Sequence, residues 1–368
     1  MKIDPYRFGE NLRRMRLERG LTQKSLGECI GFSEKSVSKW ECGAALPDIE
    51  TLFSIAEILK INAEVLLQNE ARYFLGIDGG GTKTDLVLSD ESGTVLHTCR
   101  TNACNPVDVG METAKTVLRD AIYEVCRGVR MSSVSVFAGI AGGTTAGIKE
   151  DLRAFFAEFG FAHIESDSDN RNIVAAGLGD SDGMTVILGT GFCIYTQKGG
   201  VQKRISGWGY LLDDGGSGYN LGRDALHAYY AAHDGTGEAT LLTEEIDRIR
   251  AGGPAKLLPY VYKEGKSAIA SFAPAVFAAC ERGDALACAI LDRNIGVAAE
   301  LIRRAANMIG DESVRVVLAG GLTKERRMMS GLRVALGDSA RYRLEILQCD
   351  PVQGALILAR KSGGNGHE

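Results

Sequence analysis

The sequence predicts a small all-helical domain followed by two α/β lobes with mixed sheets. Apolar residues recur at helical spacing over the first seventy residues, and the pattern changes to that of strands from Arg72. A strand, a glycine-rich turn and two further strands then occur twice, once from Tyr73 and once from Thr185. Such a duplication indicates two lobes of similar plan. Because 368 residues exceed one ordinary core, we expect domains at residues 1–70, 71–172 and 173–368, with the last helix packing back on the first lobe.

The composition, with 45% hydrophobic and 24% charged residues, is typical of a soluble globular protein. The apolar runs are too short to span a bilayer and the first residues lack the order of a secretory signal. We therefore expect a cytoplasmic protein without a membrane partner. The nine cysteines form no CxxC pair, which favours reduced packing thiols over a zinc site or a disulfide framework.

The charge of −5 is unevenly distributed along the chain. Residues 1–40 contain nine Lys and Arg against five Asp and Glu, whereas residues 41–70 contain one against six. A basic surface confined to the first forty residues suits a local contact with phosphates rather than a wholly basic protein.

The helical domain contains recognisable helix starts and stops. Thr22, Ser33 and Asp48 are typical N-cap residues, and each precedes an amphipathic stretch. Gly31 closes the short helix that Thr22 opens, and the next helix begins at Glu34. Two short helices joined by a tight glycine-containing turn form a helix-turn-helix arrangement. The alternative is a plain helical bundle that binds another protein.

The run LTQKSLGECIGFSEKSVSKWECGAALPDIETLFSIAEIL resembles the Cro/repressor-like (XRE) DNA-binding family. The resemblance implies that residues 33–41 form the recognition helix, and that a homodimer binds operator DNA because one domain contacts only a half-site. Gly27 stands where the family usually has Ala, a change that we expect to cost helix propensity without removing a contact. Further phosphate contacts are expected from Arg13, Arg14 and Arg16. The main DNA-binding positions implied are Gln23, Ser33, Glu34, Lys35, Ser38 and Lys39.

The first glycine cluster, GIDGGGTKT, does not fit the commoner phosphate loops. Thr82 separates Gly81 from Lys83, and a strand follows where a Walker A or Rossmann motif needs a helix. The cluster resembles the phosphate hairpin of the actin, sugar kinase and heat-shock ATPase superfamily, which has actin-like (ribonuclease H-like) lobes. A second such hairpin, LGTGF, lies at 188–192, and VVLAGGL lies at 316–322. Helices that connect the lobes are expected at Ala141–Phe159 and Ala289–Ile309. Glycines that merely close ordinary hairpins are the alternative.

Within that superfamily, Tyr73 to about Arg360 resembles the BadF/BadG/BcrA/BcrD ATPase and N-acetylglucosamine kinase family. The elements that carry the resemblance include FLGIDGGGTKTDLVL, TNACNPVDVG, VFAGIAGG, DSDNRNIVAAGLG, VILGTGF and GWGYLLDDGGSGYNLGRDAL. It implies that ATP and Mg²⁺ are used to phosphorylate an amino sugar at its 6-hydroxyl. The resemblance implies that Asp169 is the catalytic base and that it contacts the sugar together with Asn105, Gly142 and Gly143. It implies that Asp78 and Asp214 lie at the metal. The positions implied at the nucleotide are Gly79, Gly80, Gly81, Thr82, Lys83, Thr84, Gly189, Thr190, Gly191, Gly320 and Gly321.

Several of these positions have plainer interpretations. Asp169 could form a solvated turn with Asp167, and Asn105 before a proline could simply form a turn. Lys83 and Asp85 are more typical of solvent-facing strand positions than of active groups. The spacings Cys99-x4-Cys104 and Cys280-x7-Cys288 could suggest an iron–sulfur cluster, as in the dehydratase-activator branch of the family, but buried thiols are favoured.

The sequence also departs from the family pattern. Gly215 replaces a usual Glu, Phe192 replaces a usual Ser, and Ser206 replaces a usual Gly. These changes cluster around the expected phosphate and sugar positions, so ATP binding is expected while turnover is in doubt. The alternative function is a sugar-responsive transcriptional regulator whose kinase fold only senses its ligand.

Overall fold

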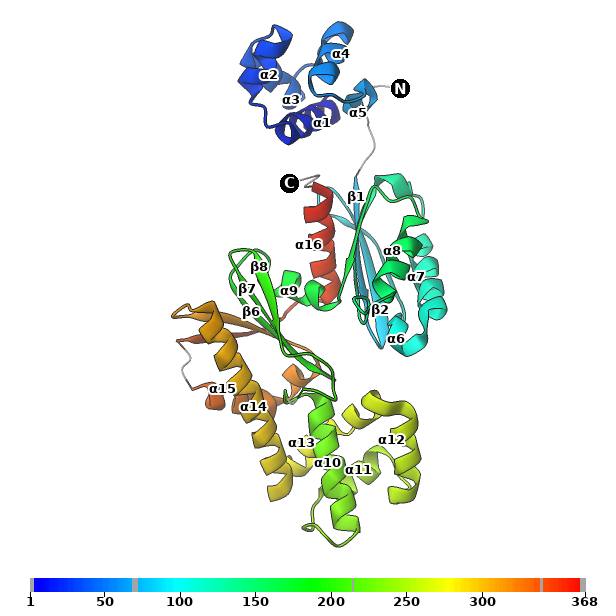
Figure 1. The fold of residues 1–368 in the computed structure, drawn as a ribbon, viewed down its shortest axis with the longest axis vertical. Coiled ribbons are helices and arrows are strands. Elements are labelled where there is room, and N and C mark those ends of the chain that lie inside the picture. Colours follow the sequence, from blue (N-terminus) through cyan, green and yellow to red (C-terminus); the bar gives the residue numbers. More distant parts are fainter. Residues whose placement is uncertain (1–2, 68–71, 214, 338–339, 365–368) are drawn as a thin grey trace. The chain divides into compact units, whose positions relative to one another are not determined.

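A computed structural model describes residues 3–67, 72–213, 215–337 and 340–364 (Figure 1). The chain divides into two compact units. Unit 1 comprises residues 1–167 and 358–368, and unit 2 comprises residues 168–357. The segment 68–71, where the sequence predicts a short linker, lies outside the described residues.

The first part of unit 1 is a five-helix bundle. Its helices are α1 (Pro5–Glu18), α2 (Gln23–Ile30), α3 (Glu34–Glu41), α4 (Ile49–Ile58) and α5 (Ala63–Leu67). The side chains of Thr22, Ser33 and Asp48 accept hydrogen bonds from backbone amides in the first turns of α2, α3 and α4, so the three predicted caps are confirmed. The bundle core consists of Phe8, Leu12, Met15, Leu26, Val37, Trp40, Leu52, Ile55, Ala56, Leu59, Ala63 and Leu66.

The structure gives a reason for Gly27 that helix propensity does not. A Cβ atom there would lie 2.7 Å from the carbonyl oxygen of Phe32. That carbonyl belongs to the turn between α2 and α3, so glycine permits the close approach of the two helices. The sequence reasoning considered only helix propensity, whereas the contact with the following turn decides the residue.

The rest of unit 1 is a five-stranded sheet with helices. The strands are β1 (Tyr73–Gly79), β2 (Lys83–Asp90), β3 (Val95–Asn102), β4 (Val134–Ile140) and β5 (His163–Asp167), in the order β3-β2-β1-β4-β5. The first three form an antiparallel meander, and β4 and β5 run parallel to β1. The helices are α6 (Pro106–Val109), α7 (Met111–Val125), η1 (Met131–Ser133) and α8 (Ile148–Ala157).

Unit 2 repeats this plan. Its strands are β6 (Gly183–Leu188), β7 (Phe192–Lys198), β8 (Val201–Ile205), β9 (Val314–Ala319) and β10 (Tyr342–Ile346), in the order β10-β9-β6-β7-β8. Again a meander is extended by two parallel strands, so the predicted duplication and fold class are confirmed. The helices are α9 (Asn170–Leu178), α10 (Gly218–His233), α11 (Leu242–Ile249), α12 (Gly253–Ala270), α13 (Ala273–Glu281), α14 (Ala285–Ile309), η2 (Gly321–Lys324) and α15 (Arg326–Leu336). The last helix, α16 (Pro351–Gly364), begins in unit 2 and ends in unit 1.

The expectation of reduced packing thiols is wrong for one cysteine pair. Cys280 near the end of α13 and Cys288 in the first turns of α14 form a disulfide, with their Cα atoms 4.9 Å apart. The tight connection between the two helices brings them together, which spacing alone does not show. Within the described residues, no group of three or more His, Cys, Asp or Glu side chains could hold a metal ion. No helix described is long and apolar enough to cross a membrane.

Candidate active site and DNA interface

Hairpin 1, residues Gly79–Lys83 between β1 and β2, is held from behind by backbone hydrogen bonds. The carbonyl oxygens of Gly79 and Gly80 accept from the amides of Ala141 (2.7 Å) and Cys104 (3.3 Å). Thr82 at the turn is exposed. Thr84 is fully buried and its hydroxyl donates to the carbonyl of Asn102 at 2.7 Å, so this side chain braces the strand pair. Asp78 precedes the hairpin and is half-buried.

The residues implied in sugar binding from unit 1 lie together. The Asn105 side chain caps α6 by accepting from the amide of Val107 at 3.1 Å, and it donates to Asp108 at 2.5 Å. Gly142 has a φ of +72°, and a Cβ there would lie 2.5 Å from the Asn105 side-chain oxygen. A Cβ at Gly81 of hairpin 1 would lie 3.2 Å from Asp108. The turn-forming interpretation of Asn105 is thus real, and the same turn places it beside hairpin 1 and Gly142.

The turns around Gly142 also correct a predicted helix. The sequence indicates a helix from Ala141 to Phe159, but residues 141–147 form turns and α8 begins only at Ile148. Gly143, the other implied sugar position, is buried, and a Cβ there would lie 2.9 Å from the carbonyl of Ile140.

Asp85 is not a solvent-facing residue, contrary to expectation. It is 6% exposed and accepts hydrogen bonds from Lys83 (2.6 Å) and Arg100 (2.5 Å). These two cations hold the pKa of the Asp85 carboxyl below its usual value against the opposing effect of burial. Asp85 pairs in register with Asp78 on β1 and with Arg100 on β3, so these side chains share one sheet face.

Asp169 lies in unit 2, directly before α9, and is half-buried. Burial raises the pKa of its carboxyl, although the Ser168 hydroxyl that donates to it at 3.2 Å acts in the opposite direction. A carboxylate with a raised pKa accepts a proton more readily than an ordinary aspartate. This environment is suited to a general base.

Hairpin 2, residues Leu188–Phe192 between β6 and β7, rests on the start of α10. The amides of Gly218 and Tyr219 donate to the carbonyls of Gly189 (2.8 Å) and Thr190 (3.0 Å). Apart from its chain neighbours, no described atom lies within 4 Å of a Cβ placed on Gly191, so the hairpin is open on that side.

The strand-plus-glycine element after β9 lies beside hairpin 2. A Cβ at Gly320 would be 2.4 Å from the carbonyl of Leu188. Gly321 is exposed and opens η2. The structure therefore brings the implied phosphate and adenosine positions of unit 2 together.

Gly215 and Gly216, directly before Ser217, are each packed tightly against another part of unit 2. A Cβ at Gly215 would lie 2.5 Å from three atoms of Phe192, and one at Gly216 would lie 2.3 Å from the carbonyl of Asn294. Gly215 and Phe192, noted separately as departures from the family, are thus in direct contact. Asp214, the second implied metal position, lies outside the described residues.

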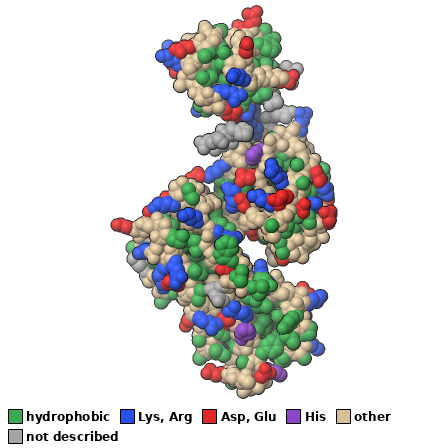
Figure 2. Space-filling model, in the orientation of Figure 1, with side chains coloured by type: hydrophobic (Ala, Val, Ile, Leu, Met, Phe, Trp, Pro, Cys, Tyr) green, Lys and Arg blue, Asp and Glu red, His purple; other side chains and the backbone are tan. Residues whose placement is uncertain are grey.

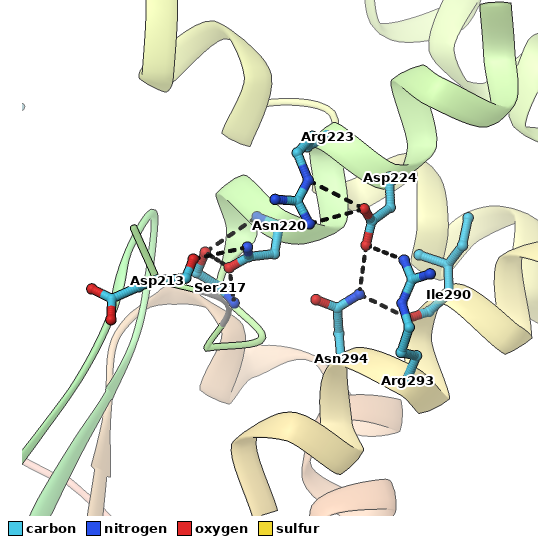
Figure 3. Close-up of polar contacts among 8 residues, drawn as sticks. All are labelled: Asp213, Ser217, Asn220, Arg223, Asp224, Ile290, Arg293 and Asn294. Carbon is cyan, nitrogen blue, oxygen red and sulfur yellow. Dashed lines mark hydrogen bonds and ion pairs between the residues drawn. The ribbon is translucent and has the colours of Figure 1, made fainter. Parts of the chain in front are cut away.

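Two sets of polar contacts that the sequence analysis missed hold α10, one at its start and one against α14 (Figure 3). Asp224 on α10 is 9% exposed and accepts from Arg293 at 2.5 Å and from Asn294 at 3.0 Å. Ser217 and Asn220 form a capping box at the start of α10, and Asn220 also donates to the carbonyl of Asp213 at 3.3 Å. One available signal was Asn294, a single polar residue on the otherwise apolar buried stripe of α14.

The expected DNA interface is exposed on α3. Ser33, Glu34, Lys35, Ser38 and Lys39 are all exposed at or after the start of this helix, as a recognition helix requires. On the face shown in Figure 2, acidic and basic side chains are interspersed.

Arg16 and Gln23 have partners inside the helical domain. Arg16 is 6% exposed, and its guanidinium donates to both carboxylate oxygens of Glu41, at 2.6 and 3.0 Å. Its expected phosphate contact is therefore wrong. The Gln23 side chain donates to the same carboxylate at 2.7 Å, and its DNA contact stays a prediction.

Comparison with known proteins supports both parts of the chain. The model of the BadF/BadG/BcrA/BcrD ATPase family matches residues 75–359. An N-acetyl-D-glucosamine kinase of Dictyostelium discoideum is 30% identical, over 78% of this chain and 98% of its own length. An N-acetylmuramic acid/N-acetylglucosamine kinase of Clostridium acetobutylicum is 28% identical over the same shares. A solved structure from Chromobacterium violaceum with a provisional N-acetylglucosamine kinase assignment matches with a TM-score of 0.66 and 26% identity, covering 78% of this chain and 99% of that one.

The helical domain has separate relatives. A helix-turn-helix family model matches residues 12–66, and the uncharacterized HTH-type transcriptional regulator YqaE of Bacillus subtilis is 33% identical over 90 residues, 24% of this chain and 67% of that protein. The chain thus joins a helix-turn-helix domain to a kinase-like domain, and it belongs to the BadF/BadG/BcrA/BcrD ATPase family.

Proposed function

We propose that this protein uses ATP to phosphorylate N-acetylglucosamine or a related amino sugar at the 6-hydroxyl, and that it also binds operator DNA through its helix-turn-helix domain. The environment of Asp169 carries the proposal, because a desolvated carboxylate with a raised pKa is what proton removal from a sugar hydroxyl requires. The kinase names of the two relatives above support the substrate class.

In this mechanism the protein mainly positions groups and neutralises charge. Asp169 accepts the proton of the attacking hydroxyl, and Asn105 and the turn at Gly142 and Gly143 orient the sugar. Turn amides of hairpins 1 and 2 hold the phosphates, and Gly320 and Gly321 adjoin the adenosine. Asp78 and Asp214 offer the carboxylate oxygens that Mg²⁺ prefers, and the ion would supply charge neutralisation at the phosphates when bound.

The test is ADP release by the purified protein with Mg-ATP across a panel of amino sugars. Sugar-dependent turnover should fall by at least about a hundredfold in Asp169→Asn, since general base catalysis contributes about 10²–10⁴-fold. Asp182→Asn is the matched control, because Asp182 is an exposed carboxylate of unit 2 that accepts from the amide of Gly199. Turnover that survives in Asp169→Asn would remove this residue from the reaction.

The second candidate function is a sugar-responsive regulator without turnover. It is favoured by the contact between Phe192 and Gly215, because the ring occupies the place where a side chain at 215 would begin. The usual Glu therefore cannot be restored at position 215 unless the ring of Phe192 moves. Sugar binding by calorimetry with no ADP release would establish this alternative and reject the kinase.

We also propose that ligands of the kinase domain change the affinity for operator DNA. Lobe closure around sugar and nucleotide would give the conformational difference that such coupling requires. Operator affinity of the proposed dimer, measured with and without sugar and ATP, should change at least about fivefold for a coupling free energy of about 1 kcal/mol. Equal affinities would show that the two activities are independent.

A further inference from the structure

Asp224 is a buried carboxylate that the proposed mechanism does not use. It lies in the second turn of α10 with its side chain 9% exposed, and receives hydrogen bonds from two neighbours on α14, Arg293 and Asn294 (Figure 3). Arg223 lies 3.3 Å from the same carboxylate. Burying a charge is costly, and losing one partner of such a group is strongly destabilising. The network therefore fixes α10 on α14 at this point.

The start of α10 determines which way hairpin 2 faces. Its first two amides, from Gly218 and Tyr219, bind the carbonyls of Gly189 and Thr190. In a planar trans peptide the carbonyl and the following amide point in opposite directions, and the described chain contains no cis peptide. The amides of Thr190 and Gly191 must therefore point away from α10, toward the open side of the hairpin.

Two successive amides that point the same way form a binding site for an anion. Their direction depends on α10, and the position of α10 depends on α14. The same residue of α14 touches the preceding segment as well, since the carbonyl of Asn294 lies against Gly216. Asn294 thus holds α10 in two ways. Its side chain binds Asp224 on α10, and its backbone carbonyl lies against Gly216, just before α10 begins.

We infer that Asp224 is a positioning residue for the nucleotide: it anchors α10 so that the amides of Thr190 and Gly191 face the phosphates of ATP. The inference rests on the proposed function for the identity of the anion. The geometry of α10 and hairpin 2 does not depend on that function.

The first experiment is Asp224→Asn with the intact protein. The new side-chain amide would face the donors of Arg293 and Asn294, so the anchor loosens while the volume stays the same. We expect KM for ATP to rise about tenfold, since small misplacements near a reacting group reduce rates by up to about 10²-fold. KM for the sugar should change less than about twofold.

Asp284→Asn is the matched control. Asp284 is also 9% exposed in unit 2, and it caps α14 by accepting from the amides of Leu241 and Ala287. Among the described residues the hydrogen-bond partners of its side chain are Thr240, Leu241 and Ala287, none of which lies on α10 or hairpin 2. Its loss should therefore lower stability without changing KM for ATP. Equal shifts of KM in both variants would reduce Asp224 to a structural role and overturn the inference.

Hydrogen exchange tests this inference independently of the proposed function. In the absence of any ligand, amides of the peptide that covers residues 186–221 should exchange faster in Asp224→Asn than in Asp284→Asn. Unchanged exchange there would overturn the inference even if the protein is an active kinase. Faster exchange in a protein that neither binds nor hydrolyses ATP would support the anchor and reject the kinase.

Arg293→Met is a milder variant in case Asp224→Asn fails to fold. Arg293 is 62% exposed, and its replacement removes only one of the hydrogen-bond donors to Asp224. We expect a smaller effect in the same direction, about threefold in KM for ATP, and no effect would count against the anchor.

Discussion

Hairpins 1 and 2 occupy the same place in two sheets of the same strand order, yet they are braced differently. The carbonyls of hairpin 1 bind amides from two loops, at Cys104 and Ala141. Those of hairpin 2 bind the first amides of a helix, at Gly218 and Tyr219. The repeated topology places both hairpins, whereas the packing behind each one is particular to its unit.

The packing behind hairpin 2 explains why two departures from the family pattern, Phe192 and Gly215, are linked. Behind hairpin 1, a Cβ at Gly79 would meet the sulfur of Cys104 at 2.5 Å. Behind hairpin 2, the ring of Phe192 meets the backbone of Gly215. A large residue on the hairpin requires a residue without a side chain on the adjoining segment, so Phe192 and Gly215 are one coupled change.

The largest expected effect comes from restoring the usual carboxylate behind hairpin 2. Gly215→Glu would force its Cβ into Phe192, so we expect a loss of about 3 kcal/mol in unfolding free energy. Combining it with Phe192→Ser should recover more than about 1 kcal/mol relative to the sum of the single changes. Urea unfolding of the parent, the two single variants and the double variant measures these free energies. Additive effects would show that the two positions are independent.

Reduction should distinguish the two units. Cys280 and Cys288 of unit 2 are bonded, whereas the described cysteines of unit 1 are free thiols. Because the disulfide closes a short loop, its loss should cost unit 2 about 2 kcal/mol. Trp208 fluorescence in a Trp40→Phe background follows urea unfolding of unit 2 with and without reductant. A Cys280→Ser/Cys288→Ser variant is the control and should be insensitive to reductant. No difference in the parent would contradict the bond.

The packing behind hairpin 1 should be more tolerant. Gly79→Ala brings a Cβ against Cys104, whose short side chain can rotate, so we expect a loss of about 1.5 kcal/mol. Cys104→Ala in the same chain should relieve most of it. Gly191→Ala is the comparison in hairpin 2, where the new methyl meets no described atom within 4 Å. Its stability should change by less than about 0.5 kcal/mol. A larger loss at Gly191 than at Gly79 would reverse the comparison.

The smallest expected effects concern one carboxylate from each unit. The pKa of Asp85 is lowered, so its ionised form stabilises the protein above the pKa of the unfolded state, and this contribution disappears as pH falls through the folded pKa. Asp85→Asn should therefore lose about 1 kcal/mol at neutral pH and nothing in acid. The pKa of Asp169 is raised, so its ionised form opposes folding at neutral pH.

Asp169→Asn should accordingly be more stable than the parent protein at neutral pH, and the gain should shrink as pH falls through the folded pKa of Asp169. Unfolding curves between neutral and acid pH measure both variants. A loss of stability in Asp169→Asn would show that its carboxylate is satisfied rather than desolvated.

Much of the fold could be predicted because its signals are local. The caps at Thr22, Ser33 and Asp48 act within one helical turn, and the strand-turn-strand pattern around each glycine cluster is continuous in the sequence. The helix predicted from Ala141 failed because turns at its start compete with helix formation. The implied site residues remain predictions, although the structure brings Asn105 beside Gly142 and Gly320 beside hairpin 2.

The sequence by itself determined the element order, the duplication and the family, because periodicity, capping and glycine spacing are properties of neighbouring residues. Only the tertiary structure decided that Arg16 is buried against Glu41, that Phe192 excludes a side chain at 215, and that Asp224 meets Asn294. These partners lie between 23 and 70 residues apart in the sequence. Contacts of that range arise from packing, where the position of one backbone decides whether another residue can carry a side chain.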